Sequence, residues 1–258
     1  MRILILGAGK MGAFLADVLS PIHEVAIFDQ DRTKLRFLFN TIKISDKEEI
    51  RDFNPEIVIN AVTIKYTIEA FESILDYISP NCILSDIASV KTGLHEFYLE
   101  SKHPFASTHP MFGPTFANLN DLSTQYAILI KESDHLAKIF FKDLFLSLNL
   151  NLFEYTFEEH DKTIAYSLTT PFVSTLAFTG VMEPQEAPGT TFKKHLQIAQ
   201  GLLAEDEYLV QEILYNPYSV KQIDAIQKQI DRLKHIIINK DNEELRAYLA
   251  ESRKNIQR

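Results

Sequence analysis

Short apolar runs alternate with amphipathic stretches through the first part of the chain. The runs are rich in Ile, Leu and Val and are bounded by glycine, proline or polar residues, which is typical of buried strands. They predict strands at residues 2–6, 24–28, 57–62, 82–84, 105–106, 126–130 and 150–155. Apolar residues at helical spacing predict helices at residues 11–19, 46–52, 67–78 and 135–146. This alternation predicts a doubly wound, mostly parallel α/β sheet in residues 1–157.

The pattern changes after residue 157, where helical spacing replaces the alternation. Helices are predicted at residues 160–181, 190–215, 220–239 and 242–255, with a loop at 182–189. Pro171 should kink the first helix or divide it into two shorter ones. We therefore expect residues 158–258 to form an all-helical domain. Its long apolar helices have little sheet to cover them, which suggests a dimerisation domain and hence a homodimer.

Composition narrows the class of protein. With 258 residues, of which 46% are hydrophobic, the chain is able to bury a substantial core. Its net charge of −9 disfavours nucleic acid or an anionic membrane surface as a partner. The single cysteine, Cys82, excludes an intramolecular disulfide and a multi-cysteine metal site, and it fits a reducing compartment.

The N-terminal segment superficially resembles a signal peptide. Lys10 and Asp17 interrupt its apolar region, and the short apolar run ends in a glycine turn. No segment approaches the roughly 18–20 uninterrupted apolar residues that a membrane span needs. We therefore expect a cytoplasmic protein, and the residue pattern gives no reason to expect a bound metal.

A glycine motif follows the first predicted strand. Gly7, Gly9 and Gly12 have the spacing G-x-G-x-x-G and lead into a helix. Gly7 permits the tight turn, Gly9 lets the backbone approach a pyrophosphate, and Gly12 allows the helix to pack closely on the strand. The helix start offers free N–H groups to the phosphates. The motif predicts a Rossmann-type dinucleotide site with the candidate cofactor-binding residues Gly7, Ala8, Gly9, Lys10, Met11 and Gly12.

Asp29 ends the second predicted strand, 29 − 7 = 22 positions after Gly7, which is the offset expected for a carboxylate that binds the ribose hydroxyls. Because this carboxylate repels a 2′-phosphate, we predict NAD rather than NADP, and the nearby Arg32 keeps NADP possible. A helix N-cap is the alternative role for Asp29. Val62 and Thr63 end a later predicted strand and are expected to line the far side of the cofactor crevice.

Polar groups follow two further predicted strands. Ser89 and Lys91 come shortly after one apolar run, and His109 comes after the next. Parallel strands end at a common edge where ligands bind, so these side chains should meet although 109 − 89 = 20 positions separate the outer two. Pro110 biases His109 to an extended backbone, and an imidazole on a rigid turn is a candidate general base. A surface histidine in a loop is the alternative.

Four motifs resemble those of the prephenate dehydrogenase family of tyrosine biosynthesis. They are G-A-G-K-M-G at residues 7–12, D-I-A-S-V-K at 86–91, H-P-M-F-G-P at 109–114 and E-H-D at 159–161. The glycine loop is shared by many dehydrogenases, whereas H-P-M-F-G-P after D-x-x-S-V-K is much more specific. The resemblance implies a Rossmann domain followed by a helical dimerisation domain. It also implies an oxidoreductase that oxidatively decarboxylates prephenate to 4-hydroxyphenylpyruvate with NAD or NADP.

The resemblance also implies roles for single residues. His109 matches the catalytic histidine that accepts the proton of the substrate's ring hydroxyl, and Ser89 matches a serine that hydrogen-bonds the same hydroxyl and the histidine. The family holds the substrate's side-chain carboxylate with an arginine, but the corresponding stretch here reads T-F-K-K-H-L. Lysine keeps the charge and loses the planar two-point grip. Lys193, Lys194 and Lys91 are therefore the candidate substrate-binding residues, and exposed surface lysines are the alternative.

Other functions stay open. Arogenate is an alternative substrate to prephenate. A β-hydroxyacid or 6-phosphogluconate-type dehydrogenase also begins G-x-G-x-M-G, although its glycine-rich substrate motif is not evident here. A non-catalytic NAD-binding regulator is a further alternative. The length after the helical domain leaves no room for a regulatory domain or a fused chorismate mutase, so we expect a monofunctional enzyme.

Overall fold

The computed structural model describes residues 1–113, 118–119 and 121–257. The chain forms two compact units, Met1–Asp161 and Lys162–Arg258. The H-P-M-F-G-P motif ends at Pro114, which lies outside the described residues. The assignment of cofactor binding to residues 1–157, and of substrate binding and dimerisation to residues 158–258, stays a prediction.

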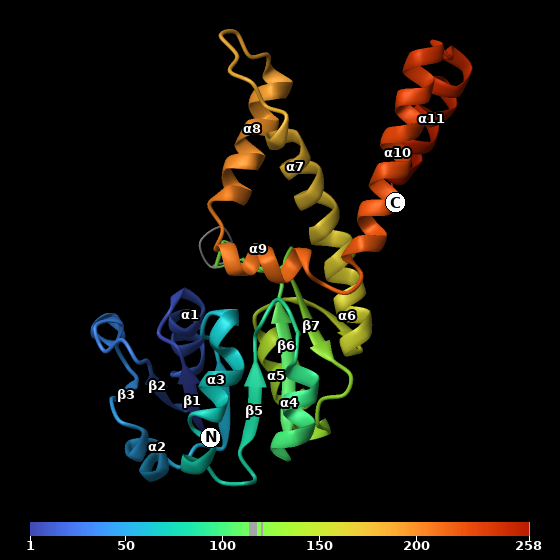
Figure 1. The fold of residues 1–258 in the computed structure, drawn as a ribbon. Helices are drawn as coiled ribbons and strands as arrows, with labels where there is room; N and C mark the ends of the chain where they lie inside the picture. The colour runs from blue at the N-terminus through green and yellow to red at the C-terminus, as the bar shows by residue number, and fades with distance from the viewer. Residues whose placement is uncertain (114–117, 120, 258) are drawn as a thin grey trace. The chain divides into compact units, whose positions relative to one another are not determined.

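An eight-stranded sheet forms the centre of the first unit, with the order β3-β2-β1-β4-β5-β6-β7-β8. Figure 1 labels β1, β2, β3, β5, β6 and β7. The first six strands are parallel, β7 is antiparallel to β6, and β8 is parallel to β7. The predicted doubly wound, mostly parallel sheet is confirmed. Its strands are β1 (Arg2–Leu6), β2 (Glu24–Phe28), β3 (Ile42–Ile44), β4 (Ile57–Asn60), β5 (Ile83–Asp86), β6 (Phe105–Pro110), β7 (Tyr126–Ile130) and β8 (Asn151–Tyr155).

Helices cover both faces of this sheet, because successive strand residues point to opposite sides. Helices α1 (Lys10–Leu19) and α5 (His135–Ser147) bury their apolar residues on one face. Helices α2 (Lys47–Phe53), α3 (Thr67–Glu72) and α4 (Leu94–Ser101) do so on the other. Two hydrophobic cores therefore hold the sheet between them, and strand residues contribute to them in alternation: Ile3, Ile5, Ile27 and Ile59 to the first, and Leu4, Leu6, Val58 and Leu84 to the second.

Three of the central parallel strands, β1, β4 and β5, end in step, and β6 continues past them to Pro110. Leu6 of β1 lies opposite Asn60 of β4, Asn60 lies opposite Asp86 of β5, and Asp86 lies opposite Ser107 of β6. The loops after these strands therefore leave from one edge of the sheet, where ligands of such folds bind. Asn60 shapes the loop after β4, because its side-chain oxygen accepts from the backbone N–H of Val62 at 3.2 Å.

The second unit is built from helices, as predicted, but the helix predicted at residues 160–181 is divided. Helix α6 (Phe157–Ile164) is followed by a π-helical segment, η4 (Ala165–Thr169), and then by α7 (Thr170–Gly180). Pro171 lies in the first turn of α7 and follows the π-helical segment closely. Thr169 and Thr170 before it keep right-handed helical dihedrals, so the chain stays helical through the proline, and the wider turn of η4 lies where the proline's missing N–H falls.

The helix predicted at residues 190–215 is also two helices, α8 (Thr190–Leu203) and α9 (Glu207–Leu214). Asp206 begins α9 anew, because its carboxylate accepts from the backbone N–H groups of Tyr208 and Leu209. The prediction of one helix missed this break, because capping by a single aspartate leaves helical apolar spacing on either side of it.

Helices α10 (Ser219–Asn239) and α11 (Asn242–Asn255) agree with their predicted bounds within one residue. The helix predicted at residues 67–78 is shorter in the structure: α3 ends at Glu72, and a 3₁₀ turn, η3 (Leu75–Tyr77), follows. Of the helices in the described ranges, none combines the length and the apolar character that a bilayer span requires.

Candidate active site

The glycine turn between β1 and α1 depends on two of its three glycines for its shape. Gly7 has a φ of +95°, and a Cβ there would lie 2.9 Å from the carbonyl oxygen of Ala61. A Cβ on Gly12 would lie 1.9 Å from the carbonyl oxygen of Gly7. A Cβ on Gly9 would meet no atom within 4 Å, so the space beside Gly9 is open. The turn is therefore tight where helix meets strand and free where a phosphate would approach.

A cavity of about 440 Å³ opens beside this turn. The structure brings five of the predicted cofactor-binding residues to its walls: Gly7, Gly9, Asp29, Val62 and Thr63. The remaining four lie in the turn or in the first turn of α1: Ala8, Lys10, Met11 and Gly12. Open backbone beside a helix N-terminus, with a carboxylate at the cavity wall, fits a nucleotide diphosphate with a free ribose.

Asp29 is held onto the glycine turn by its own hydrogen bonds. Its Oδ2 accepts from the backbone N–H of Ala8 at 2.8 Å, and its Oδ1 accepts from the backbone N–H of Asp31 at 2.8 Å. Lys34 Nζ lies 3.7 Å from Oδ2. These contacts differ from the alternative role of Asp29 as a helix N-cap. At the start of the next turn, the carboxylate that accepts from Thr33 is that of Asp31. The Asp29 carboxylate is thus positioned at the cavity wall.

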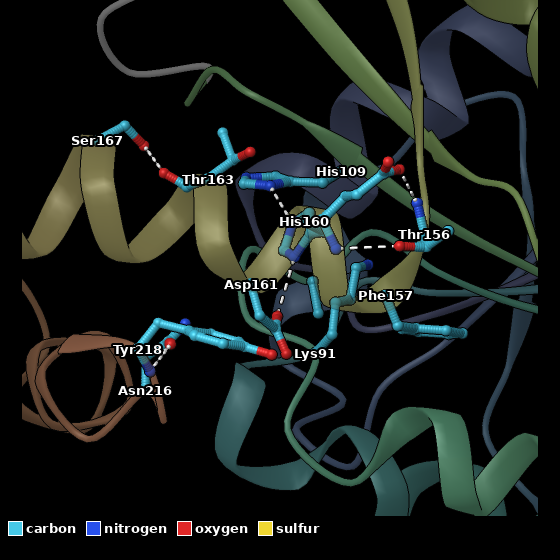
Figure 2. Close-up of polar contacts among 12 residues, drawn as sticks. Lys91, His109, Thr156, Phe157, His160, Asp161, Thr163, Ser167, Asn216 and Tyr218 are labelled. Atoms are coloured by element: carbon cyan, nitrogen blue, oxygen red, sulfur yellow. Dashed lines mark hydrogen bonds and ion pairs between the residues drawn. The ribbon is translucent and has the colours of Figure 1, made fainter. Parts of the chain in front are cut away.

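His109 lies near the carboxyl end of β6 and is 6% exposed. Its Nδ1 is 3.0 Å from Nε2 of His160, and Nδ1 of His160 is 3.1 Å from Oδ1 of Asp161 (Figure 2). Burial holds the pKa of His109 well below its ordinary value, and the neighbouring His160 and Lys91 lower it further. His109 is therefore neutral near pH 7, the form that accepts a proton. It does not line the cavity beside the glycine turn, but it occupies the same edge of the sheet two strands from β4.

The buried ionisable side chains of Asp86, Lys91 and Tyr98 form a cluster close to the backbone of His109. The carboxylate of Asp86 forms an ion pair with Lys91 and also accepts from the hydroxyl of Tyr98 at 2.8 Å. Lys91 Nζ donates to the carbonyl oxygen of Thr108 at 2.7 Å, which fixes the backbone next to His109. Burial lowers the pKa of Lys91, and the contact with Asp86 opposes that effect. The ammonium group is committed to these partners, so substrate binding by Lys91 stays a prediction.

The other predicted site residues lie apart from this cluster. Ser89 is half-buried in the loop after β5, and the hydrogen bonds found within the described ranges do not join its side chain to His109. Of the three groups predicted to meet, Lys91 contacts the backbone of Thr108 next to His109, and the meeting of all three stays a prediction. Lys193 and Lys194 are exposed on α8 of the second unit, and their roles stay predictions.

His160 was not singled out as a functional residue from the sequence. It lies 51 positions from His109 and is fully buried in the first turns of α6. The only sequence signal at this position was the E-H-D motif at residues 159–161. The motif supports the family resemblance but does not indicate a role for His160.

Comparisons with known proteins agree with this geometry. Residues 29–135 match the family described as "Prephenate dehydrogenase, nucleotide-binding domain". A curated relative from Methanocaldococcus jannaschii, described as a probable arogenate/prephenate dehydrogenase, is 25% identical over 204 residues. That stretch is 73% of this chain and 45% of the relative, so the match spans less than half of the relative's length.

Solved structures show the same fold over the whole chain. Prephenate dehydrogenase from Aquifex aeolicus, in complex with hydroxyphenyl propionate and NAD+, is similar with a TM-score of 0.85 and 21% identity, covering 100% of this chain and 97% of that one. Synechocystis arogenate dehydrogenase is similar with a TM-score of 0.79 and 18% identity, covering 100% and 99%. Together the comparisons support the family that the four sequence motifs predicted.

Proposed function

We propose that this chain, a member of the prephenate dehydrogenase family, oxidises prephenate with NAD and releases carbon dioxide to give 4-hydroxyphenylpyruvate. The observation that carries this proposal is the buried, neutral His109 at the same sheet edge as the glycine-turn cavity. A general base next to a dinucleotide site is what oxidation of a hydroxyl-bearing carbon requires.

The cofactor site is assigned to the first unit. The open backbone at Gly9 and the start of α1 would receive the pyrophosphate, and Asp29 would accept hydrogen bonds from the ribose hydroxyls. Val62 and Thr63 would line the opposite wall. The negative charge of Asp29 disfavours a 2′-phosphate, which supports NAD over NADP. Bound NAD supplies the hydride acceptor.

His109 removes the proton of the substrate's ring hydroxyl as that carbon loses its hydride. Ser89 hydrogen-bonds the same hydroxyl and orients it toward the imidazole. Loss of the ring carboxylate as carbon dioxide then makes the ring aromatic, so the step is effectively irreversible. A positioned base of this kind typically contributes about 10²–10⁴-fold to the rate.

The substrate is a dianion, and the chain carries a net charge of −9, so local cations must attract it. The exposed Lys193 and Lys194 on α8 are the first candidates for its side-chain carboxylate. Lys91 is the second choice, because its ammonium already neutralises Asp86.

Arogenate is the second candidate substrate. It carries an amino group where prephenate has a keto oxygen, and the names of the M. jannaschii relative and of the Synechocystis neighbour both include it. The oxidised ring is the same in both compounds, so the roles of His109 and Ser89 do not distinguish them.

NADH or NADPH formation with prephenate and with arogenate, each tried with NAD and NADP, tests this proposal. We expect the fastest reaction with prephenate and NAD. His109→Asn should lower kcat by at least about 10²-fold and leave NAD affinity near that of the wild type, because the imidazole lies outside the glycine-turn cavity. Undiminished turnover in His109→Asn would remove the assignment, and NAD binding without turnover of either substrate would favour a non-catalytic regulator.

A further inference from the structure

We propose that His160 and Asp161 are positioning residues that fix the tautomer of His109, so that Nδ1 carries its proton and Nε2 is free to accept one. The catalytic consequence rests on the proposed function, whereas the tautomer itself does not. The three side chains form a row in which Asp161 Oδ1 faces His160 Nδ1 at 3.1 Å, and His160 Nε2 faces His109 Nδ1 at 3.0 Å (Figure 2).

The direction of each hydrogen bond follows from what each group is able to do. An ionised carboxylate only accepts, so Nδ1 of His160 must carry the hydrogen that it donates to Asp161. A neutral imidazole has a single N–H, which leaves Nε2 of His160 with a lone pair. Nε2 of His160 therefore accepts, and Nδ1 of His109 must donate. The second nitrogen of His109, Nε2, is left unprotonated.

Both imidazoles are neutral in this row. Burial lowers the pKa of each, and the positive charge of Lys91 lowers both further. Asp161 opposes the effect at His160, and Asp86 does so more weakly. The backbone holds the row in place, because the N–H of His160 donates to the carbonyl oxygen of Thr156 at 2.9 Å.

The opposite arrangement would disable the base. If His160 donated from Nε2, then His109 would accept at Nδ1 and carry its hydrogen on Nε2, where no proton could be taken up from substrate. The carboxylate of Asp161 thus selects the active tautomer of His109 through His160. A carboxylate that orients a catalytic imidazole is known from other enzymes, and here a second imidazole is inserted between the two.

Nitrogen-15 NMR of histidine-labelled protein tests the tautomer without any substrate. The spectrum of the free protein near pH 8 should show His109 with hydrogen on Nδ1 and none on Nε2, with its signals assigned by their loss in His109→Asn. His160→Gln and His160→Met form a matched pair of similar size. The glutamine oxygen takes the place of Nε2 as an acceptor and should keep the tautomer, whereas methionine offers only a weak acceptor and should allow the Nε2–H form.

The same pair separates positioning from packing in turnover. We expect His160→Met to lower kcat with prephenate by about 10²-fold and His160→Gln by less than about tenfold, with similar KM values. Asp161→Asn should give a mixture of tautomers, because an amide is able to donate as well as accept. Wild-type His109 with hydrogen on Nε2, or identical tautomers in the Gln and Met variants, would overturn the proposal. A wild type inactive on prephenate would instead defeat the proposed function and leave the NMR result to decide the tautomer.

Discussion

Burial sets the protonation of individual residues in this protein. His109 and His160 contact each other away from solvent, and both have pKa values below the ordinary 6.5. The unfolded chain takes up protons on these imidazoles as the pH falls through 6.5. In the folded chain the imidazoles stay neutral to a lower pH. The folded state therefore loses stability below pH 6.5, and above it these groups contribute no pH dependence.

The free energy of unfolding should fall by up to about 1.4 kcal/mol per pH unit for each of the two imidazoles between pH 6.5 and pH 5. Urea unfolding measured across this range tests the slope. His160→Gln should flatten it, because one buried titrating group is removed. His135→Gln, at an exposed position, should leave the slope unchanged. Equal slopes in all three proteins would show that the histidine pair does not control acid stability.

For single residues, the sequence predicted contacts within one short segment better than contacts between residues far apart in the chain. The spacing from Gly7 to Asp29 indicated a shared site because one short β-α-β segment brings the two together, and both line the cavity. The contact between His109 and His160 crosses 51 positions and has no local spacing. The pairing of Lys91 with Asp86 was also missed, because a lysine near a strand end has the same pattern whether it faces ligand or core.

Among the elements, strands were easier to predict than breaks between helices. Buried parallel strands are nearly continuous apolar runs, so most of the sheet followed from the pattern. The apolar pattern does not predict β3, because its three residues are too few to show one. The segment η4 and the break before α9 each lie between stretches with helical apolar spacing, so spacing alone extends one helix through each of them.

The glycine turn gives a test at the scale of one element. Gly12→Ala should lower the free energy of unfolding by about 1–3 kcal/mol, because the new Cβ would overlap the carbonyl oxygen of Gly7, which is backbone and cannot rotate away. Gly9→Ala should leave stability within about 1 kcal/mol, since the space beside it is open, yet weaken NAD binding by occupying that space. Thermal unfolding and NAD titration measure the two effects. A stable Gly12→Ala with normal NAD affinity would contradict the tight packing of α1 on β1.

For the molecule as a whole, we infer a homodimer formed through the helical unit. Helix α10 exposes isoleucines at seven-residue spacing, Ile223, Ile230 and Ile237, with exposures of 37%, 55% and 70%. This spacing places them along one side of the helix, where a second copy would cover them. The cost of leaving such a row in water favours association.

Sedimentation of the double variant Ile230→Glu/Ile237→Glu tests the dimer. Two buried carboxylates would have no partners, so the variant should sediment as a monomer while the wild type sediments as a dimer. Ile22→Glu is the matched control, because Ile22 is also strongly exposed but lies in the first unit. A monomeric wild type, or a double variant that remains dimeric, would exclude this face of α10 as the interface.

The buried ion pair of Asp86 and Lys91 has different consequences for the stability of the protein and for its activity. Well-packed hydrophobic residues often replace such pairs with no loss of stability, or with a gain. A library of variants at Asp86, Lys91 and Tyr98 that is selected only for heat tolerance should therefore accept apolar replacements. The same library selected for turnover should retain the lysine, because its ammonium anchors the Thr108 carbonyl beside His109, the proposed base. Selecting this protein for thermal stability and selecting it for turnover would then lead to different sequences at the same three positions.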